Sequence, residues 1–238
     1  MERRLIEIEG KIVFTELAEL VDPGHAALVL VDMQRDFIDA DGAFGRLGAD
    51  LSMYPPMRQR LSMLLETARK AGVLVVHVQM TALPGRVSDS PAQLRFNLRM
   101  HASLRAGGPA LNYTESGTPG REFAEEFRPC PGELVVPKWR SSAFYGTNLD
   151  LLLRSNGIKT VVVTGCTTEG CVESTARDAL FSDYYVVVAE DCVASDDRRQ
   201  HDASLLLMRH RFDLAASADI AALWPPAGQC GEHTIGIA

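Results

Sequence analysis

Apolar residues along the chain fall into six short runs that predict buried strands of a parallel sheet. The runs cover about residues 28–32, 73–79, 133–137, 160–164, 185–189 and 212–216. Segments with helix-spaced apolar residues lie between or beyond them, at 56–71, 147–156, 171–183, 198–211 and 218–224. Strands and helices that alternate in this way predict an α/β fold, a three-layer αβα arrangement with a doubly wound, mostly parallel six-stranded sheet of Rossmann-like topology.

Three segments lie outside this alternation. Residues 81–132 are rich in Gly, Pro, Ser and Arg, with one helical patch around Gln93 to Leu104, and a connection of this length is typical of a loop that closes over substrate or contacts another subunit. The N-terminal arm, 1–24, predicts a short hairpin at a subunit interface. The C-terminal tail, 225–238, predicts a flexible end or an arm on a neighbouring subunit. We expect the whole chain to form a single domain.

Composition narrows the class of partner and the compartment. The 238 residues are 46% hydrophobic and carry a net charge of −7, which supports a sizeable core and disfavours nucleic acid as a partner. No apolar run is long enough to span a membrane, and the N-terminus has no pattern of a secretory signal. Five cysteines without framework spacing favour a reducing compartment, so we expect a cytoplasmic protein.

Three charged or nucleophilic residues follow predicted strands. Asp32 ends one apolar run, Lys138 ends another, and Cys171 lies just after a third, at the expected start of a helix. Ligands bind at the carboxyl ends of strands in open α/β sheets, so a base, a cation and a thiol at these ends predict a nucleophilic-cysteine site. A helix start favours the thiolate form of Cys171. Cys166, five residues earlier, is interpreted as a packing residue.

The residues around these positions resemble a known family. The stretch 31–37 reads VDMQRDF, Lys138 is followed at 142–147 by SAFYGT, and 165–172 reads GCTTEGCV. These motifs are similar to those of the isochorismatase-like cysteine hydrolases, over about residues 25 to 220. That family includes amidohydrolases acting on N-carbamoylsarcosine, ureidoacrylate, maleamate, biuret and nicotinamide. The motifs are most similar to the carbamoyl, ureido and maleamate branch.

The resemblance implies a role for each site residue. Asp32 would be the general base, Lys138 its charge partner and Cys171 the nucleophile. The backbone N–H groups of Thr167 and Cys171 would stabilise the oxyanion, and the Cys166–Thr167 peptide bond would be cis. Because the branch that cleaves isochorismate lacks the cysteine, Cys171 argues against that reaction.

Other candidate ligand-binding residues have weaker sequence signals. Phe37 and Phe144 would line the substrate pocket, as matching aromatics do in the family. Arg198 and Arg199 could bind a substrate carboxylate, although a solvated helix face explains either arginine alone. Nicotinamidases of the family bind a metal through an aspartate and nearby histidines, but Asp50 has no histidine within several residues, so we predict no metal and no other cofactor.

The sequence therefore predicts a cysteine amidohydrolase that cleaves a C–N bond of a small linear amide or ureido (N-carbamoyl) compound and releases ammonia through a thioester intermediate. We expect a homodimer or homotetramer. Two alternatives remain open at this point. One is a non-catalytic homologue on the same fold, and the other is a redox-sensing thiol protein in which Cys166 resolves an oxidised Cys171.

Overall fold

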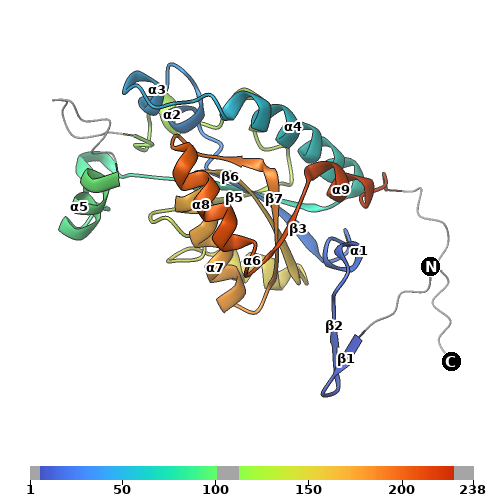
Figure 1. Ribbon diagram of the computed structural model, residues 1–238. Coiled ribbons are helices and arrows are strands. Elements are labelled where there is room, and N and C mark those ends of the chain that lie inside the picture. The colour runs from blue at the N-terminus through green and yellow to red at the C-terminus, as the bar shows by residue number, and fades with distance from the viewer. Residues whose placement is uncertain (1–5, 101–112, 228–238) are drawn as a thin grey trace.

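The centre of the molecule is a six-stranded sheet in which every neighbouring pair of strands is parallel (Figure 1). The computed structural model describes residues 6–100 and 113–227. The sheet order is β5-β4-β3-β6-β7-β8. The strands are β3 (Ala26–Val31), β4 (Leu74–Met80), β5 (Leu134–Lys138), β6 (Thr160–Cys166), β7 (Tyr185–Ala194) and β8 (Asp213–Ala215). Each contains most of one predicted run, so the predicted α/β class is confirmed.

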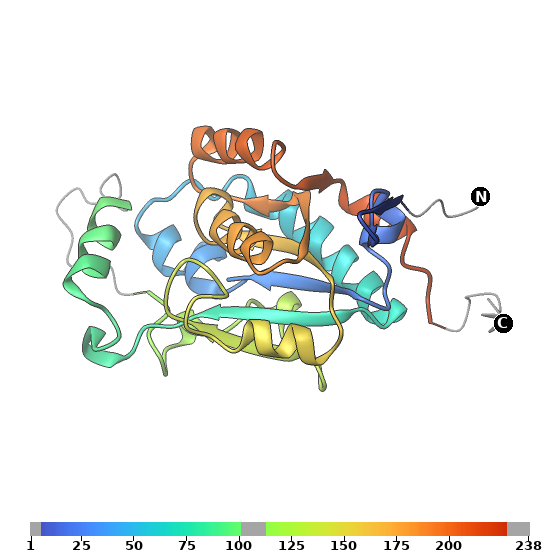
Figure 2. The same ribbon diagram turned by 90° about the horizontal axis from the view of Figure 1, so that it is seen from below.

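Helices cover both faces of this sheet (Figures 1 and 2). They are α1 (Leu17–Leu20), α2 (Arg35–Ile38), α3 (Ala43–Arg46), α4 (Tyr54–Ala71), α5 (Pro91–Met100), α6 (Leu149–Ser155), α7 (Glu173–Phe181), α8 (Arg198–Met208) and α9 (Ser217–Ala222). The five predicted helices correspond to α4 and α6 to α9. The four-residue helices α1, α2 and α3 were not predicted, because one turn is too short to show a helical period.

Packing on both faces of strand β3 explains why its apolar run is continuous. Leu28 and Leu30 pack into the core cluster that contains the buried face of α4. Val29 and Val31 point to the other face and pack into the cluster that contains residues of α6 and α7. Because successive side chains of a strand point to opposite faces, a strand between two helical layers needs apolar residues at every position.

The order of the strands creates a crevice beside β3. The chain runs outward from β3 through β4 to β5, and then returns to β6 on the other side of β3 and continues to β7 and β8. The direction of winding thus reverses between β3 and β6. In open parallel sheets, this switch point at the carboxyl ends of the strands is where ligands bind.

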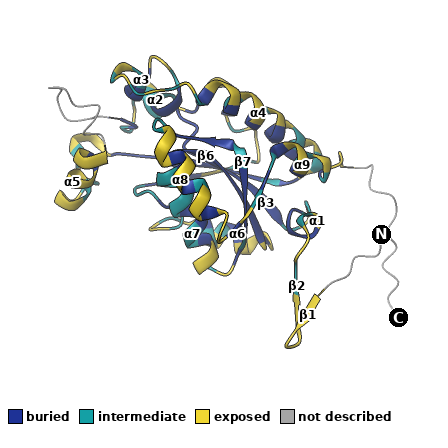
Figure 3. Cartoon of the chain, in the orientation of Figure 1, coloured by how far each residue is buried: buried dark blue, intermediate teal, exposed yellow. Residues whose placement is uncertain are grey.

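The N-terminal segment forms the predicted hairpin, in which β1 (Ile6–Ile8) pairs antiparallel with β2 (Lys11–Val13). It projects from the body and its residues are largely exposed (Figures 1 and 3). Its location at a subunit interface remains a prediction.

The other two segments outside the sheet are partly described. Within 81–132, α5 corresponds to the predicted helical patch, and short 3₁₀ turns occur at Pro84–Arg86, Pro119–Arg121 and Glu125–Phe127. Residues 101–112 lie outside the described part. In the tail, the N–H of Ala227 donates to Lys70 O at 2.8 Å, and 228–238 lie outside the described residues. None of the described helices is long and apolar enough to cross a membrane.

Candidate active site

The structure brings Asp32, Lys138 and Cys171 together at the carboxyl end of the sheet. Lys138 Nζ lies 2.8 Å from Asp32 Oδ2 and 3.1 Å from Cys171 Sγ. Asp32 directly follows β3, Lys138 is the last residue of β5, and Cys171 belongs to the π-helical turn Thr168–Val172 after β6. The three strand ends that carried the sequence prediction therefore meet in one cluster.

Lys138 reaches this cluster across β4, which separates β5 from β3 in the sheet. Its Nζ passes 3.5 Å from the Sδ of Met80, the last residue of β4, and donates to the backbone O of Arg140 at 3.0 Å. The side chains of Lys138 and Asp32 are both 0% exposed. A lysine is buried to this extent only when its charge is paired, so the pair with Asp32 explains its position.

The backbone at the end of β4 holds the Asp32 carboxylate. Met80 N lies 2.9 Å from Asp32 Oδ1 and 2.8 Å from Gln34 Oε1, and donates to both. Gln34 Nε2 in turn donates to Met80 O and to Arg121 O, at 2.9 and 2.8 Å. Gln34 therefore fixes the peptide that positions the carboxylate. This role of Gln34 has no local sequence signal, because it depends on a contact with a residue 46 positions away along the chain.

Burial is the largest single influence on the pKa values of Asp32, Lys138 and Cys171. Burial raises the pKa of Asp32, and the neighbouring Lys138 offsets part of this rise. Burial also acts to lower the pKa of Lys138, but the charge of the Asp32 carboxylate outweighs it and leaves the pKa above its usual value. The lysine is therefore charged at neutral pH and pairs with the carboxylate.

The same environment changes the expectation for the thiol. Burial raises the pKa of Cys171 to about 12; Lys138 opposes this rise and the Asp32 charge adds to it. The sequence analysis predicted that a helix start would favour the thiolate, but Cys171 precedes α7 by two residues and lies in the π-helical turn. The raised pKa of Cys171 contradicts the predicted preference for the thiolate.

The end of β6, just before the turn that carries Cys171, lies very close to the backbone of β3. Gly165, with φ +105°, approaches β3 so closely that a Cβ there would lie 2.0 Å from Val31 O. The next residue, Cys166, is 0% exposed, and its Sγ donates to Asp32 O at 3.3 Å. This supports the interpretation of Cys166 as a packing residue. The Cys166–Thr167 peptide bond is cis, as the resemblance implied. The oxyanion role of the Thr167 and Cys171 N–H groups remains a prediction.

A cavity of about 390 Å³ opens beside Cys171. Thr167, Gly170 and Cys171 line it together with Phe37, so Phe37 lies where the sequence analysis expected it. The other apolar lining residues were not predicted from the sequence. They come from α3 and the residues just after it, from β4, from α5 and from the segment after 112: Phe44, Ala49, Met80, Phe96, Met100 and Tyr113.

Other predicted ligand contacts lie elsewhere. Phe144 does not line this cavity; its ring packs against Tyr184, with ring centroids 5.9 Å apart, at the second core cluster. Arg198 and Arg199 do not line it either. Arg198 Nε pairs with Asp202 at 3.0 Å on an exposed helix face, which is the alternative that the sequence analysis considered. The neighbours Asp196, Asp197 and Gln200 line the cavity instead.

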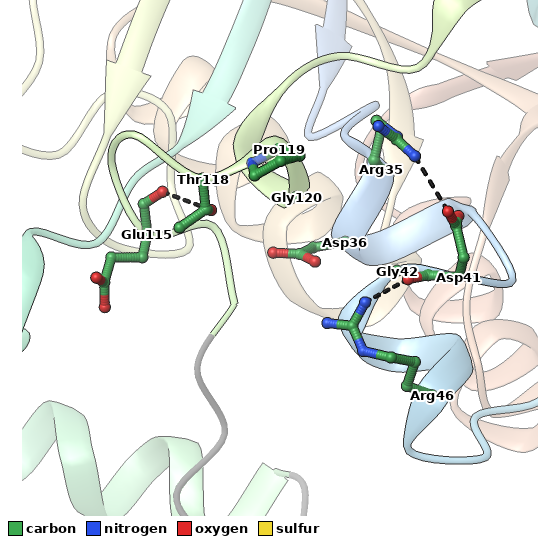
Figure 4. A pocket seen from close by; sticks show the side chains of 9 residues that line it. All are labelled: Arg35, Asp36, Asp41, Gly42, Arg46, Glu115, Thr118, Pro119 and Gly120. Carbon is green, nitrogen blue, oxygen red and sulfur yellow. Dashed lines mark hydrogen bonds and ion pairs between the residues drawn. The ribbon is translucent and has the colours of Figure 1, made fainter.

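A second cavity of about 370 Å³ lies against α2 and α3, and several of its charged groups already have partners (Figure 4). Arg35 Nη2 pairs with Asp41 at 3.1 Å, and Arg46 donates to the backbone O of Asp41. Asp36 accepts from the N–H groups of Ala43 and Thr114, at 3.0 and 2.7 Å. None of the described residues that line it is a cysteine, serine, lysine or histidine, so the cavity beside Cys171 is the better candidate for nucleophilic chemistry.

The described residues contain no group of three or more His, Cys, Asp or Glu side chains that could hold a metal ion. Asp50 lines the cavity beside Cys171, and its Oδ1 accepts from Ser52 N at 2.9 Å.

Comparison with known proteins agrees with this arrangement. The protein-family model described as the isochorismatase domain matches residues 26–219 of this chain. The chain belongs to the isochorismatase family. Ureidoacrylate amidohydrolase RutB of Enterobacter sp. (strain 638) is 36% identical over 172 residues, which cover 71% of this chain and 75% of that protein.

Solved structures of the family superpose on most of the chain. N-carbamoylsarcosine amidase from Thermoplasma acidophilum has a TM-score of 0.62 and 32% identity, covering 81% of this chain and 96% of that one. Pyrazinamidase of Pyrococcus horikoshii, solved in complex with zinc, has a TM-score of 0.64 and 26% identity, covering 81% and 99%. The family domain thus includes the β3, β5 and β6 ends that carry the cluster.

Proposed function

We propose that this protein is a cysteine amidohydrolase that cleaves a C–N bond of a small linear amide or ureido compound and releases ammonia. The observation that carries the proposal is the position of Lys138 Nζ, 2.8 Å from Asp32 and 3.1 Å from Cys171, beside a cavity that Cys171 lines. A nucleophile, a base and a cation in contact at a ligand-sized cavity are the parts that acyl transfer requires.

In the first half of the reaction, Cys171 Sγ attacks the carbonyl carbon while its proton passes to Asp32. A thiol with a raised pKa is a weak nucleophile, so proton transfer to the carboxylate has to accompany the attack. The carbonyl oxygen becomes an oxyanion, which the N–H groups of Thr167 and Cys171 would stabilise. Asp32 then returns the proton to the leaving nitrogen, the C–N bond breaks, and ammonia leaves a thioester on Cys171.

In the second half, water attacks the thioester carbon and gives a proton to Asp32. The tetrahedral intermediate collapses, the C–S bond breaks, and Asp32 returns the proton to the Cys171 sulfur. The net reaction consumes one amide and one water and yields one acid and one ammonia. Lys138 remains charged throughout, where it holds Asp32 in place and stabilises the negative charge that develops on sulfur.

The named relatives and the size of the cavity support the proposed substrate class. The two named relatives act on ureidoacrylate and on N-carbamoylsarcosine, which are both small ureido compounds. A cavity of about 390 Å³ lies near the lower end of the range for small-molecule sites. Small linear amides and ureido compounds are therefore the first substrates to test.

The proposal is tested by measuring ammonia release from a panel of small primary amides and ureido compounds. We expect turnover by the native protein and none by Cys171→Ala. Hydroxylamine added during turnover should trap the acyl group as a hydroxamate. Absence of ammonia release across the panel would favour the non-catalytic homologue. Rapid peroxide oxidation of Cys171, with a disulfide to Cys166, would favour the redox protein.

We further propose that the reaction needs no metal or organic cofactor. The steps above use only Cys171, Asp32, Lys138 and backbone donors. Exhaustive dialysis against EDTA should leave the rate of ammonia release unchanged. Loss of activity that Zn²⁺ or Fe²⁺ restores would contradict this and add a metal to the mechanism.

A further inference from the structure

The turn that carries Cys171 has an unusual backbone conformation. Residues Thr168–Val172 form a π-helical turn, in which Val172 N donates to Thr167 O at 3.1 Å. Such turns are rare, and they occur mostly as single turns at functional sites. Cys171 is the fourth residue of this one. The position of its sulfur therefore depends on the contacts that hold the turn in place.

Helix α8 holds the first residue of this turn through two side chains. Thr168 Oγ1 lies 2.8 Å from His201 Nδ1, and Ser204 Oγ lies 3.4 Å from Thr168 O. All three residues are buried. His201 and Ser204 are three positions apart, so they lie on the same face of the helix. Ser204 Oγ also donates to Glu173, the first residue of α7, at 2.5 Å, and α8 thus contacts both ends of the turn.

The start of α8 is fixed at the wall of the Cys171 cavity. Asp197 is the N-cap residue, and its Oδ1 accepts from the N–H groups of Arg199 and Gln200, at 2.9 and 3.2 Å. Asp197 and Gln200 both line the cavity. The N–H of His201 donates to Asp197 O at 3.0 Å, so His201 belongs to the capped first turn. A capped helix start is a firm support from which a side chain can hold its neighbour.

The protonation state of His201 suits a hydrogen bond to a hydroxyl group. Burial lowers the pKa of His201, while Asp202 opposes this change and Arg198 adds to it. The ring is therefore neutral at neutral pH, with one nitrogen that donates and one that accepts. The Thr168 hydroxyl has no other hydrogen-bond partner within the described part of the chain. Loss of the His201 ring would leave this buried hydroxyl unsatisfied, which is costly.

Neither His201 nor Thr168 is among the described residues that line the Cys171 cavity, and His201 lines a separate cavity of about 260 Å³. We propose that His201 is a positioning residue: through Thr168 it holds the π-helical turn so that Cys171 Sγ stays 3.1 Å from Lys138 Nζ. The catalytic consequence of this hold rests on the function proposed above. The hold on the sulfur itself does not require that function.

Two pairs of substitutions separate the hydrogen bond from the bulk of the side chains. His201→Asn places an amide group near the position of Nδ1, whereas His201→Gln places it near the position of Nε2 and leaves Thr168 without this partner. Thr168→Ser keeps the hydroxyl, whereas Thr168→Val keeps the shape of the side chain and removes the hydroxyl. His210→Gln is the matched control, because His210 is exposed and lies just beyond the end of α8.

The first measurement is the rate at which iodoacetamide alkylates Cys171, which does not require turnover. The sulfur forms a bond to carbon, iodide leaves, and the thiol proton passes to solvent. We expect His201→Gln and Thr168→Val each to slow alkylation by about threefold to tenfold, because a shift of the sulfur by about 1 Å weakens the stabilisation of the thiolate by the Lys138 ammonium. Peptide mass spectrometry separates Cys171 from the exposed Cys130.

The conservative variants show whether the hydrogen bond is responsible. His201→Asn, Thr168→Ser and His210→Gln should all react at close to the native rate. The double variant His201→Gln/Thr168→Val should be no slower than either single variant, because both substitutions remove one bond. Unchanged or faster alkylation in the two disrupting variants, or equal slowing by Asn and Gln at position 201, would overturn the proposal. Since the two variants break the bond from opposite sides, either one that keeps the native melting temperature decides the test.

The second measurement connects the position of the sulfur to the reaction. On an amide that the native protein hydrolyses, His201→Gln should lower kcat by about 10- to 10²-fold, because a displacement of about 1 Å of a reacting group has effects of this size. KM should change little, since His201 does not line the cavity. His201→Asn should recover most of kcat. A rise in KM without a fall in kcat would overturn the positioning role.

The two measurements also separate this proposal from the proposed function. If no amide is hydrolysed but alkylation slows in His201→Gln and recovers in His201→Asn, the amidohydrolase is wrong and the hold on Cys171 stands. If ammonia is released at the native rate by a folded His201→Gln protein, the positioning role is wrong and the amidohydrolase stands.

Discussion

A carboxyl group lies at each end of strand β5, and the surroundings shift the pKa values of the two carboxyl groups in opposite directions. At its amino end, Glu133 accepts from Arg69 Nε at 2.6 Å, from His77 Nε2 at 2.8 Å and from Cys130 N at 2.7 Å. Burial acts to raise the pKa of Glu133, but these hydrogen bonds outweigh it and lower the pKa to about 2. The charged form is the one that this end of the strand stabilises.

At the carboxyl end of β5, the surroundings stabilise the charged forms of Asp32 and Cys171 less than the amino end stabilises the charged form of Glu133. Burial raises the pKa of Asp32 and of Cys171 despite the ammonium of Lys138. One cation is shared between a carboxylate and a thiol, whereas Glu133 alone accepts four hydrogen bonds from three residues. Perturbed pKa values concentrate at functional sites, because groups there exchange protons during a reaction. The comparison supports a structural role for one end of β5 and agrees with the chemical role proposed for the other.

The largest expected effect is that of Cys171→Ala. Turnover should fall by more than roughly 10⁴-fold, because the atom that forms the covalent bond is removed. Melting temperature and oligomeric state should stay close to those of the native protein. Cys130→Ala, at the opposite end of β5, is the matched control and should keep full turnover. Ammonia release by a well-folded Cys171→Ala protein would rule out the nucleophile.

Removing the carboxylate charge at each end of β5 should separate activity from stability. Asp32→Asn should lower turnover by about 10²–10⁴-fold, since the proton acceptor is lost. Glu133→Gln should leave kcat unchanged and destabilise the fold by about 1–2 kcal/mol, because hydrogen bonds to a charged acceptor become weaker. Steady-state kinetics and urea unfolding of both variants provide the two readouts. The comparison fails if both variants change the same quantity.

The variant Lys138→Met tests the buried ion pair between Lys138 and Asp32. The variant should lose turnover by about 10²-fold or more, because the positive charge beside the developing thiolate is gone. It should also unfold about 3–5 kcal/mol more easily, since an uncompensated carboxylate remains buried. Asp32→Asn in the same chain should recover much of that stability without recovering turnover. Equal stability of the single and double variants would show that the pair is not coupled.

The sequence predicted the fold and the central cluster because both depend on local patterns. Continuous apolar runs predict buried parallel strands, and the carboxyl ends of such strands share one edge of the sheet. The order of residues along the chain was therefore enough to predict that Asp32, Lys138 and Cys171 lie together. The resemblance to the family supplied their roles, and the structure supports their proximity.

The rest of the site depends on contacts between distant segments. Gln34 acts through Met80, and Tyr113 joins Phe37 and Phe44 from a segment about 70 residues away. No local pattern encodes such contacts. The raised pKa of the thiol was also unpredictable, because it follows from the depth of burial rather than from the helix start. Phe144 was misplaced because an aromatic residue within a motif can pack into the core as well as line a pocket.

The smallest effect expected from the comparison concerns pH. A carboxyl group whose pKa is lowered in the folded state stabilises the fold above its unfolded pKa, about 4.3 for glutamate, and this contribution disappears as pH falls through the folded value. For Glu133 that window extends from about pH 4.3 down to about 2. The free energy of unfolding of the native protein and of Glu133→Gln should therefore differ at about pH 6 and converge as pH approaches about 2. A constant difference between native protein and Glu133→Gln over this range would mean that the charge of Glu133 is not what stabilises the amino end of β5.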